Sequence, residues 1–157
     1  MTRPNQSGDE TKRDRIRELI DGVLPLDELA ELQRETKTGD RVEIVIAIEQ
    51  SRVSWSDRIL VPLQENLYVV ERSDEARVVK CFCGHEFGDY RLNWKEEALV
   101  YDRPPQDGVV FQPNKGADPA WQSLREFYCP SCAAQLDVEP VPSGYPFVFN
   151  FLPDLGD

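Results

Sequence analysis

The sequence predicts an α+β fold, in which an N-terminal helical pair precedes a mostly antiparallel β domain with a zinc-ribbon-like pair of cysteine turns. Three observations predict it. Apolar residues recur at helical spacing early in the chain, short β-rich segments alternate with turns after them, and the four cysteines form two close pairs. We expect a flexible tail over residues 1–12, a helical segment over 13–40, a β-rich zinc-ribbon-like domain over 41–144 and an aromatic arm over 145–157.

The helical segment contains two amphipathic stretches. The first runs from Arg13 to Leu24 and ends at Pro25, with apolar side chains at the i, i+3, i+4, i+7, i+8 positions of one helix face: Ile16, Leu19, Ile20, Val23 and Leu24. The second is expected over 26–34, before a turn at 38–40, with three side chains buried: Leu26, Leu29 and Ala30. The polar residues 1–12 are expected to fray.

Several short segments have the composition of strands. Residues 41–50 place Val42, Ile44, Ile46 and Ile48 on one face, which favours a strand over an exposed helix. Further strands are expected over 59–63, 67–70, 77–80 and 136–141, and residues 121–128 lead into the second cysteine pair. Residues 91–102 fit a helix or a strand, and 103–119, rich in proline, glycine and aspartate, indicate a loop.

The four cysteines indicate a metal site. They are Cys81 and Cys83, then Cys129 and Cys132. Disulfides are rare in the reducing cytosol, where we expect this chain because it shows no signal-peptide core. A redox Cys-x-x-Cys pair would leave the first pair unexplained. Four thiolates satisfy a tetrahedral structural zinc ion, although the 45 residues between the pairs require an insertion. Zinc is favoured, and free or redox thiols are the alternative.

His85 is the only histidine and lies two residues beyond Cys83. It could replace a sulfur ligand or border an open catalytic position. Alternatively, it hydrogen-bonds a ligand sulfur or the backbone beside the ion. A catalytic zinc ion normally has three protein ligands and one open position, whereas four thiolates leave no open position. The second role is therefore favoured.

The charge pattern excludes several classes of function. The net charge of -11 argues against binding to nucleic acid or to anionic membranes, because both need clustered lysine and arginine. No apolar run approaches the ~20 residues of a membrane-spanning helix. The sequence contains neither a P-loop nor a dinucleotide-binding glycine motif. We therefore expect a chain that is not catalytic on its own.

The C-terminal arm combines aromatic residues and prolines, and no Lys, Arg or His follows Ala133. Such a segment could fold back as an edge strand onto its own core. It could equally pack on another protein, since aromatic residues are enriched at interfaces. Both interpretations remain open at this stage.

Several motifs resemble those of a known family. They are Cys81-Phe82-Cys83-Gly84-His85, Asn93-Trp94-Lys95, the run from Trp121 to Cys132, Leu136-Asp137-Val138-Glu139 and Tyr145-Pro146. Together with residues 16–29 and 55–63, they are similar to the small zinc-binding subunit of acetone carboxylase, and the related acetophenone carboxylase has a similar subunit. The chain stops soon after Pro153, which favours the acetophenone type or another ketone carboxylase.

The resemblance implies a specific chemistry. Such enzymes use ATP to activate a ketone and bicarbonate, and the new carbon–carbon bond gives a β-keto acid. ATP and bicarbonate would bind on large subunits similar to hydantoinases and oxoprolinases, while this chain would bind Zn²⁺ and help to hold the hetero-oligomer together. Two other functions stay open: an independent zinc-ribbon adaptor between proteins, and a metalloenzyme that uses His85.

Overall fold

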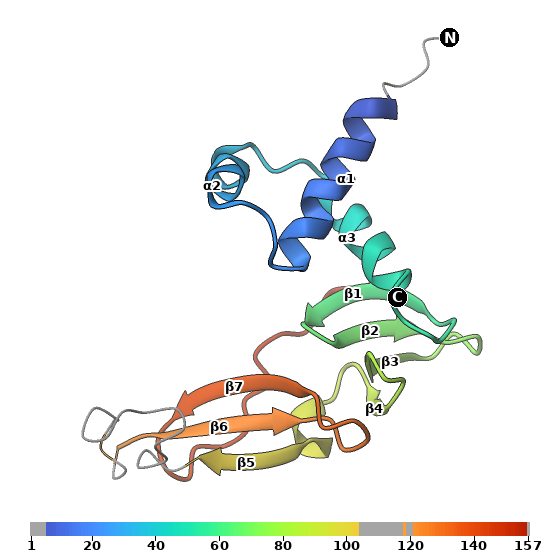
Figure 1. Ribbon diagram of the computed structural model, residues 1–157. Helices are drawn as coiled ribbons and strands as arrows, with labels where there is room; N and C mark the ends of the chain where they lie inside the picture. The colour runs from blue at the N-terminus through green and yellow to red at the C-terminus, as the bar shows by residue number, and fades with distance from the viewer. Residues whose placement is uncertain (1–5, 104–117, 119–120, 157) are drawn as a thin grey trace. The chain divides into compact units, whose positions relative to one another are not determined.

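The computed structural model describes residues 6–103, 118 and 121–156 (Figure 1). The chain divides into two compact units, one ending at Arg52 and the other beginning at Val53. The first unit is helical, and the second contains two antiparallel sheets. The α+β fold expected from the sequence is thus confirmed, while the boundary between the units follows Arg52 instead of residue 40. Within the described residues, no helix has the length and apolar content to cross a bilayer.

The first two helices lie close to where the sequence predicts them. Helix α1 spans Gln6–Ile20 and α2 spans Leu26–Arg34. Helix α1 begins earlier than the sequence indicates, because it already includes residues 6–12, which were assigned to the tail. Leu26, expected to be buried, is 83% exposed since it occupies the first residue of α2. Leu32 in the last part of α2 is buried instead, together with Ile16 of α1.

The strand expected over residues 41–50 is wrong, because this segment forms helix α3, Arg41–Gln50. Apolar residues occupy most of its positions, so strand and helix periods both fit the pattern. The bond from the Ile44 N–H to the Asp40 carbonyl opens the helix at 3.1 Å. Glu43 in the first turn also suits the positive end of the helix dipole. Ile48 is fully buried.

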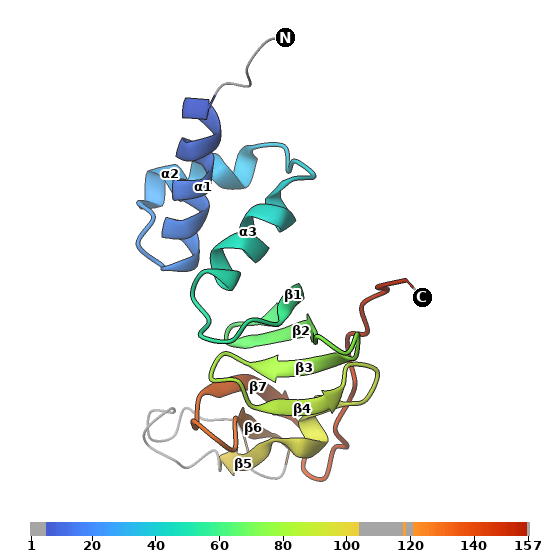
Figure 2. The same ribbon diagram turned by 90° about the vertical axis from the view of Figure 1, so that its right-hand side faces the viewer.

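The second unit begins with a four-stranded sheet in the order β1-β2-β3-β4 (Figure 2). The strands are β1 Arg58–Gln64, β2 Leu67–Glu71, β3 Arg77–Cys81 and β4 Glu86–Asp89. The first three confirm the strands expected from the sequence, and β4 was not expected. Every neighbouring pair is antiparallel, so short turns join the strands. One of these turns, between β3 and β4, carries the first cysteine pair.

A three-stranded sheet follows, in the order β5-β6-β7. Its strands are β5 Leu99–Arg103, β6 Ser123–Tyr128 and β7 Gln135–Val141. The ambiguous segment 91–102 contains both kinds of structure, a 3₁₀ helix η1 at Trp94–Glu97 and most of β5. The expected loop over 103–119 falls largely outside the described residues. The second cysteine pair lies in the turn between β6 and β7.

One hydrophobic core joins the two sheets of the second unit. It contains Leu67, Val79, Cys81, Phe87, Trp94, Phe127, Cys129 and Leu136. Aromatic rings meet edge to face through this core, with centroid distances of 5.8 Å from Phe87 to Trp94 and 5.9 Å from Trp94 to Phe127. Because Cys81 and Cys129 belong to the core, the packing of both sheets fixes the positions of the two cysteine turns.

The C-terminal segment folds back on this core without forming a strand. The ring of Phe147 lies 5.4 Å from that of Phe127, edge to face. The edge strand considered from the sequence is therefore wrong, although the return to the core is confirmed. Pro146 and Pro153 explain why this segment does not hydrogen-bond to a sheet as a strand, because proline has no backbone N–H to donate.

Candidate metal centre

The first cysteine turn closes the β3–β4 hairpin. The Cys81 N–H donates to the His85 carbonyl at 2.8 Å, and the Gly84 N–H donates to the Cys81 carbonyl at the same distance. Gly84 has φ +98°, a conformation that glycine adopts without a steric penalty. The Trp55 ring N–H donates to the Phe82 carbonyl at 3.0 Å and supports the turn from outside. This backbone geometry brings both sulfurs to one side of the hairpin.

The second turn closes the β6–β7 hairpin in a similar way. The Cys129 N–H donates to the Ala134 carbonyl, and the Ala133 N–H donates to the Cys129 carbonyl, both at 2.9 Å. Ala133 has φ +56°, so an alanine occupies the left-handed position that glycine occupies in the first turn. The two turns thus hold their cysteines by matching backbone bonds, although one has Cys-x-Cys and the other Cys-x-x-Cys spacing.

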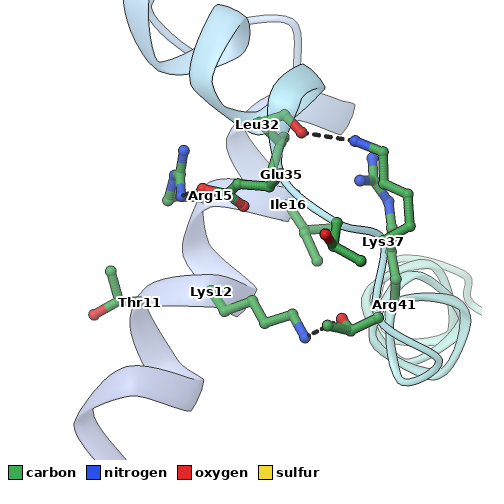
Figure 3. A pocket seen from close by; sticks show the side chains of 10 residues that line it. Thr11, Lys12, Arg15, Ile16, Leu32, Glu35, Lys37 and Arg41 are labelled. Carbon is green, nitrogen blue, oxygen red and sulfur yellow. Dashed lines mark hydrogen bonds and ion pairs between the residues drawn. The ribbon is translucent and has the colours of Figure 1, made fainter.

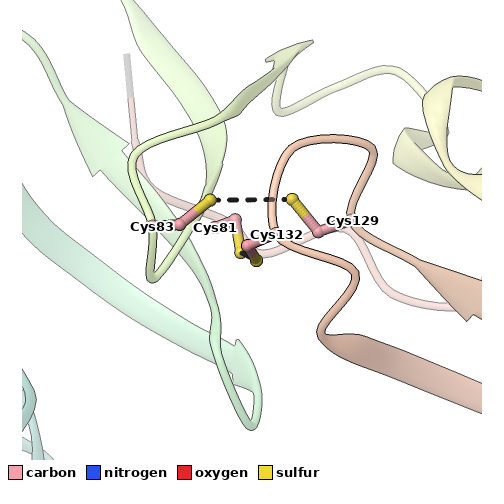
Figure 4. A group of neighbouring side chains, drawn as sticks. All are labelled: Cys81, Cys83, Cys129 and Cys132. Atoms are coloured by element: carbon pink, nitrogen blue, oxygen red, sulfur yellow. Dashed lines mark hydrogen bonds between the residues drawn. The ribbon is translucent and has the colours of Figure 1, made fainter.

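The four sulfur atoms gather at one point between the turns (Figure 4). All lie within 4.8 Å of one another, with Cys81 and Cys132 3.8 Å apart and Cys83 and Cys129 3.7 Å apart. A disulfide bond needs about 2.05 Å, so these cysteines are free thiols. Thiolates bind zinc at about 2.3 Å, and the sulfurs of a regular tetrahedron then lie about 3.8 Å apart. The two short distances fit a tetrahedral ion.

The site lies at the edge of the core. Cys81 and Cys129 are fully buried, whereas Cys83 and Cys132 are exposed. Each of the two short sulfur pairs contains one cysteine from each turn. An ion at this point would therefore crosslink the two hairpins, and with them the two sheets.

Burial acts on the pKa of Cys81, Cys83 and Cys132. It raises the pKa of Cys81 far above its ordinary value and also raises the pKa of Cys83. At Cys132 burial acts in the same direction, but the backbone N–H of Ala134 and the neighbouring sulfurs outweigh it, so this pKa is lowered. A bound cation reverses the effect of burial, because a coordinating thiol is deprotonated. The four sulfurs therefore suit a soft divalent metal ion. A tetrahedral set of four sulfur ligands is typical of zinc or iron.

His85 lies beside the four sulfurs and is not among the side chains at metal-binding distance in the described part of the chain. Its Nδ1 is 2.9 Å from the Ser131 hydroxyl oxygen, and its ring packs 4.9 Å from that of Phe87, edge to face. His85 comes from the first turn and Ser131 from the second. Their hydrogen bond thus joins the two turns outside the sulfur cluster, a contact that sequence spacing does not reveal.

The helical unit contains a separate cavity of about 330 Å³ (Figure 3). Its floor is apolar, and several cations surround it, but three of these are already engaged. Lys12 pairs with Asp40 at 2.6 Å, Arg15 pairs with Glu35 at 2.9 Å, and Lys37 donates to a backbone carbonyl. Partners within the helical unit therefore offset the charge of these three cations.

The fold and the site define a small α+β protein with a four-cysteine candidate metal centre built from two hairpin turns. Residues 53–157 match the model of one family, described as the acetone carboxylase gamma subunit. The chain belongs to this family, which confirms the resemblance seen in the sequence. The matched range corresponds to the β-rich unit that carries all four cysteines.

Two relatives show how far the similarity extends. The acetone carboxylase gamma subunit of Xanthobacter autotrophicus is 34% identical over 146 residues, which cover 91% of this chain and 87% of that protein. The acetophenone carboxylase beta subunit of Aromatoleum aromaticum is 29% identical over 77 residues, 46% of this chain and 60% of that protein. Both names denote one subunit of a multi-subunit carboxylase, so this chain is a carboxylase subunit.

Proposed function

We propose that this chain is the zinc-binding, non-catalytic subunit of an ATP-dependent ketone carboxylase in the cytosol. The complex would join a ketone and bicarbonate into a β-keto acid. The observation that carries this proposal is the gathering of four cysteine sulfurs within 4.8 Å of one another in a member of a carboxylase subunit family. Large subunits similar to hydantoinases and oxoprolinases would bind ATP and bicarbonate.

The donor set supports a structural role for the metal. Four thiolates complete a tetrahedron and leave no position for water or substrate. The ion would hold the β3–β4 and β6–β7 hairpins together, and the rigid second unit could then present a fixed surface to the other subunits. The chemistry that zinc supplies here is charge neutralisation and crosslinking of thiolates.

Metal analysis of the native protein tests the zinc assignment. We expect one zinc per chain, and X-ray absorption at the zinc edge should show a shell of four sulfurs. One iron per chain would overturn the choice of metal but keep the site. A shell containing nitrogen or oxygen would instead favour the metalloenzyme that uses His85, and His85→Ala would then abolish turnover.

Purification of the tagged chain from its own cells tests the assembly. We expect large carboxylase subunits to co-purify in a fixed stoichiometry, and ATP-dependent fixation of labelled bicarbonate into a β-keto acid. A monodisperse single chain without these subunits would favour the alternative, an independent zinc-ribbon adaptor.

The identity of the ketone is decided by the same assay. The sequence favoured an acetophenone-type enzyme, whereas the relative that matches over more of the chain is named for acetone. The purified complex should therefore be compared on acetone and acetophenone at equal concentrations. The ketone with the higher kcat/KM identifies the type.

A further inference from the structure

The C-terminal segment Tyr145–Gly156, here called the strap, is fixed to the β-rich unit near both of its ends (Figure 2, red). Near its start, the Arg125 guanidinium donates to the Tyr145 carbonyl at 2.8 Å, and the Asn93 amide donates to the Phe147 carbonyl at 3.2 Å. At its end, Arg77 donates to the Gly156 carbonyl at 2.7 Å. Side chains of the folded unit therefore hold a segment that has no strand or helix of its own.

One aromatic side chain of the strap points inward. Phe147 packs on the fully buried ring of Phe127, and the Arg125 guanidinium lies 4.8 Å from the centre of the Phe147 ring. The contact combines an edge-to-face aromatic pair with a cation–π interaction. It fixes the path of the strap without using the residues that follow.

Those following residues turn apolar side chains toward solvent. Phe151 is 55% exposed, Leu152 is 56% exposed and Val148 is 40% exposed. Exposed aromatic and aliphatic residues are typical of the anchors that carry binding energy in protein interfaces. Because both ends of the strap are fixed, binding would not need to order its backbone, which lowers the entropy cost of association.

The charge around the strap restricts the partner. Within the strap the charged side chain is Asp154, the two arginines that contact the strap (Arg77 and Arg125) already donate to its carbonyl groups, and the whole chain has a net charge of -11. A second copy of the same chain would present a like charge and be repelled. A surface with an apolar groove bordered by lysine or arginine would be complementary.

We propose that the strap is the docking element by which this subunit binds a partner subunit of the carboxylase, through Phe151 and Leu152 in an apolar groove with a basic rim. This inference rests on the proposed function, because it takes the partner from the carboxylase complex. It goes further by specifying which surface of the chain contacts the partner subunit.

The test uses the full complex and the double variant Phe151→Ser/Leu152→Ser. Both side chains are more than half exposed, so the isolated chain should fold and bind its metal as before. Leu92→Ser, at a residue that is 66% exposed outside the strap, is the matched control. We expect the double variant to bind the large subunits on the order of tenfold more weakly, or worse, and the control to bind them like the parent chain.

Each outcome decides between the two proposals. Equal retention of the large subunits by the double variant and the parent chain would overturn the strap as docking element and leave the proposed function intact. If the parent chain itself retains no large subunits, the proposed function fails. If the parent chain self-associates and the double variant does not, the strap binds a second copy, and the proposed partner is wrong.

Discussion

At the scale of single residues, two buried lysines hold the second unit together electrostatically. Lys95 is fully buried and pairs with Asp137 at 2.9 Å and with Glu139. Lys80 is 6% exposed, pairs with Asp57 and, at 2.9 Å, with Glu86, and lies 5.4 Å from the Trp55 ring. Each ammonium group thus has two carboxylates as partners, which offsets the loss of hydration.

Replacing Lys95 by methionine should destabilise the protein strongly. The change leaves two partly buried carboxylates without their cation, and breaking a buried pair in this way costs about 3–5 kcal/mol. Urea denaturation of the metal-loaded protein measures the loss. Arg58→Met is the control, since the Arg58 side chain is 68% exposed and its pair with Glu71 should contribute about 1 kcal/mol or less. Equal midpoints for both variants would contradict a role for Lys95 in stability.

Replacing Cys129 by alanine should release the metal and lower the melting temperature. The change removes one of the four clustered sulfurs and leaves a gap in the core cluster. Structural zinc contributes ~10–16 kcal/mol in small peptides, which is comparable to the whole ~5–15 kcal/mol net stability of a domain. Metal content and a thermal melt measure both effects. Ser131→Ala, in the same turn, should keep the metal. A Cys129→Ala protein with unchanged metal and melting curve would remove this residue from the ligand set.

At the scale of elements, the two cysteine turns adopt the same left-handed backbone conformation with different residues. Both place one residue at positive φ directly after the second cysteine, Gly84 in the first turn and Ala133 in the second. A glycine in the sequence indicates a position that can adopt positive φ, whereas an alanine does not. The second turn was still predicted, because its Cys-x-x-Cys spacing marks it independently.

Gly84→Ala should weaken the first turn more than Ala133→Gly affects the second. An alanine at φ +98° is strained by about 1–2 kcal/mol, and its Cβ would also lie 3.4 Å from Cδ1 of Trp55. At Ala133, glycine relieves strain but adds chain entropy, so the change should stay within about 1 kcal/mol. Thermal melting and the rate of zinc loss to a chelator measure both variants. Faster loss from Ala133→Gly than from Gly84→Ala would contradict this order.

The helices and strands that were predicted correctly are those with an unambiguous pattern of apolar and turn residues. The strands β1, β2 and β3 are short β-rich segments between turns, and α2 has clear boundaries at Pro25 and at the turn near Gly39, so all four were predicted. Helix α3 was missed because its apolar residues fit either period. Strand β4, Glu86–Asp89, was missed because its four residues contain one apolar side chain and one glycine.

At the scale of the whole molecule, the candidate metal centre and the core of the second unit are one structure. Cys81 and Cys129 belong to the same buried cluster as Trp94 and Phe127. The helical unit has buried residues of its own, Ile16, Leu32 and Ile48, and contains no cysteine. Loss of the metal should therefore affect the two units differently.

Removing the metal with a chelator should loosen the second unit and spare the first. We expect hydrogen exchange at amides in β3 and β6 to accelerate at least about tenfold, and exchange in α1 to change little, because only the β-rich unit has its core tied to the thiolates. Hydrogen-exchange mass spectrometry measures both regions in one experiment. Equal acceleration in α1 and β6 would show that the metal stabilises the chain as a whole.

The sequence by itself determined the α+β class, the four cysteines as one candidate site, and the family. These features depend on residue type and local spacing, which can be read along the chain. Only the tertiary structure decided that residues 41–50 are helical, that His85 meets Ser131, and that the strap is fixed at both ends while Phe151 faces solvent. Each of these depends on groups distant in the sequence, or on which of two equally good local patterns packs better, and packing exists only in three dimensions.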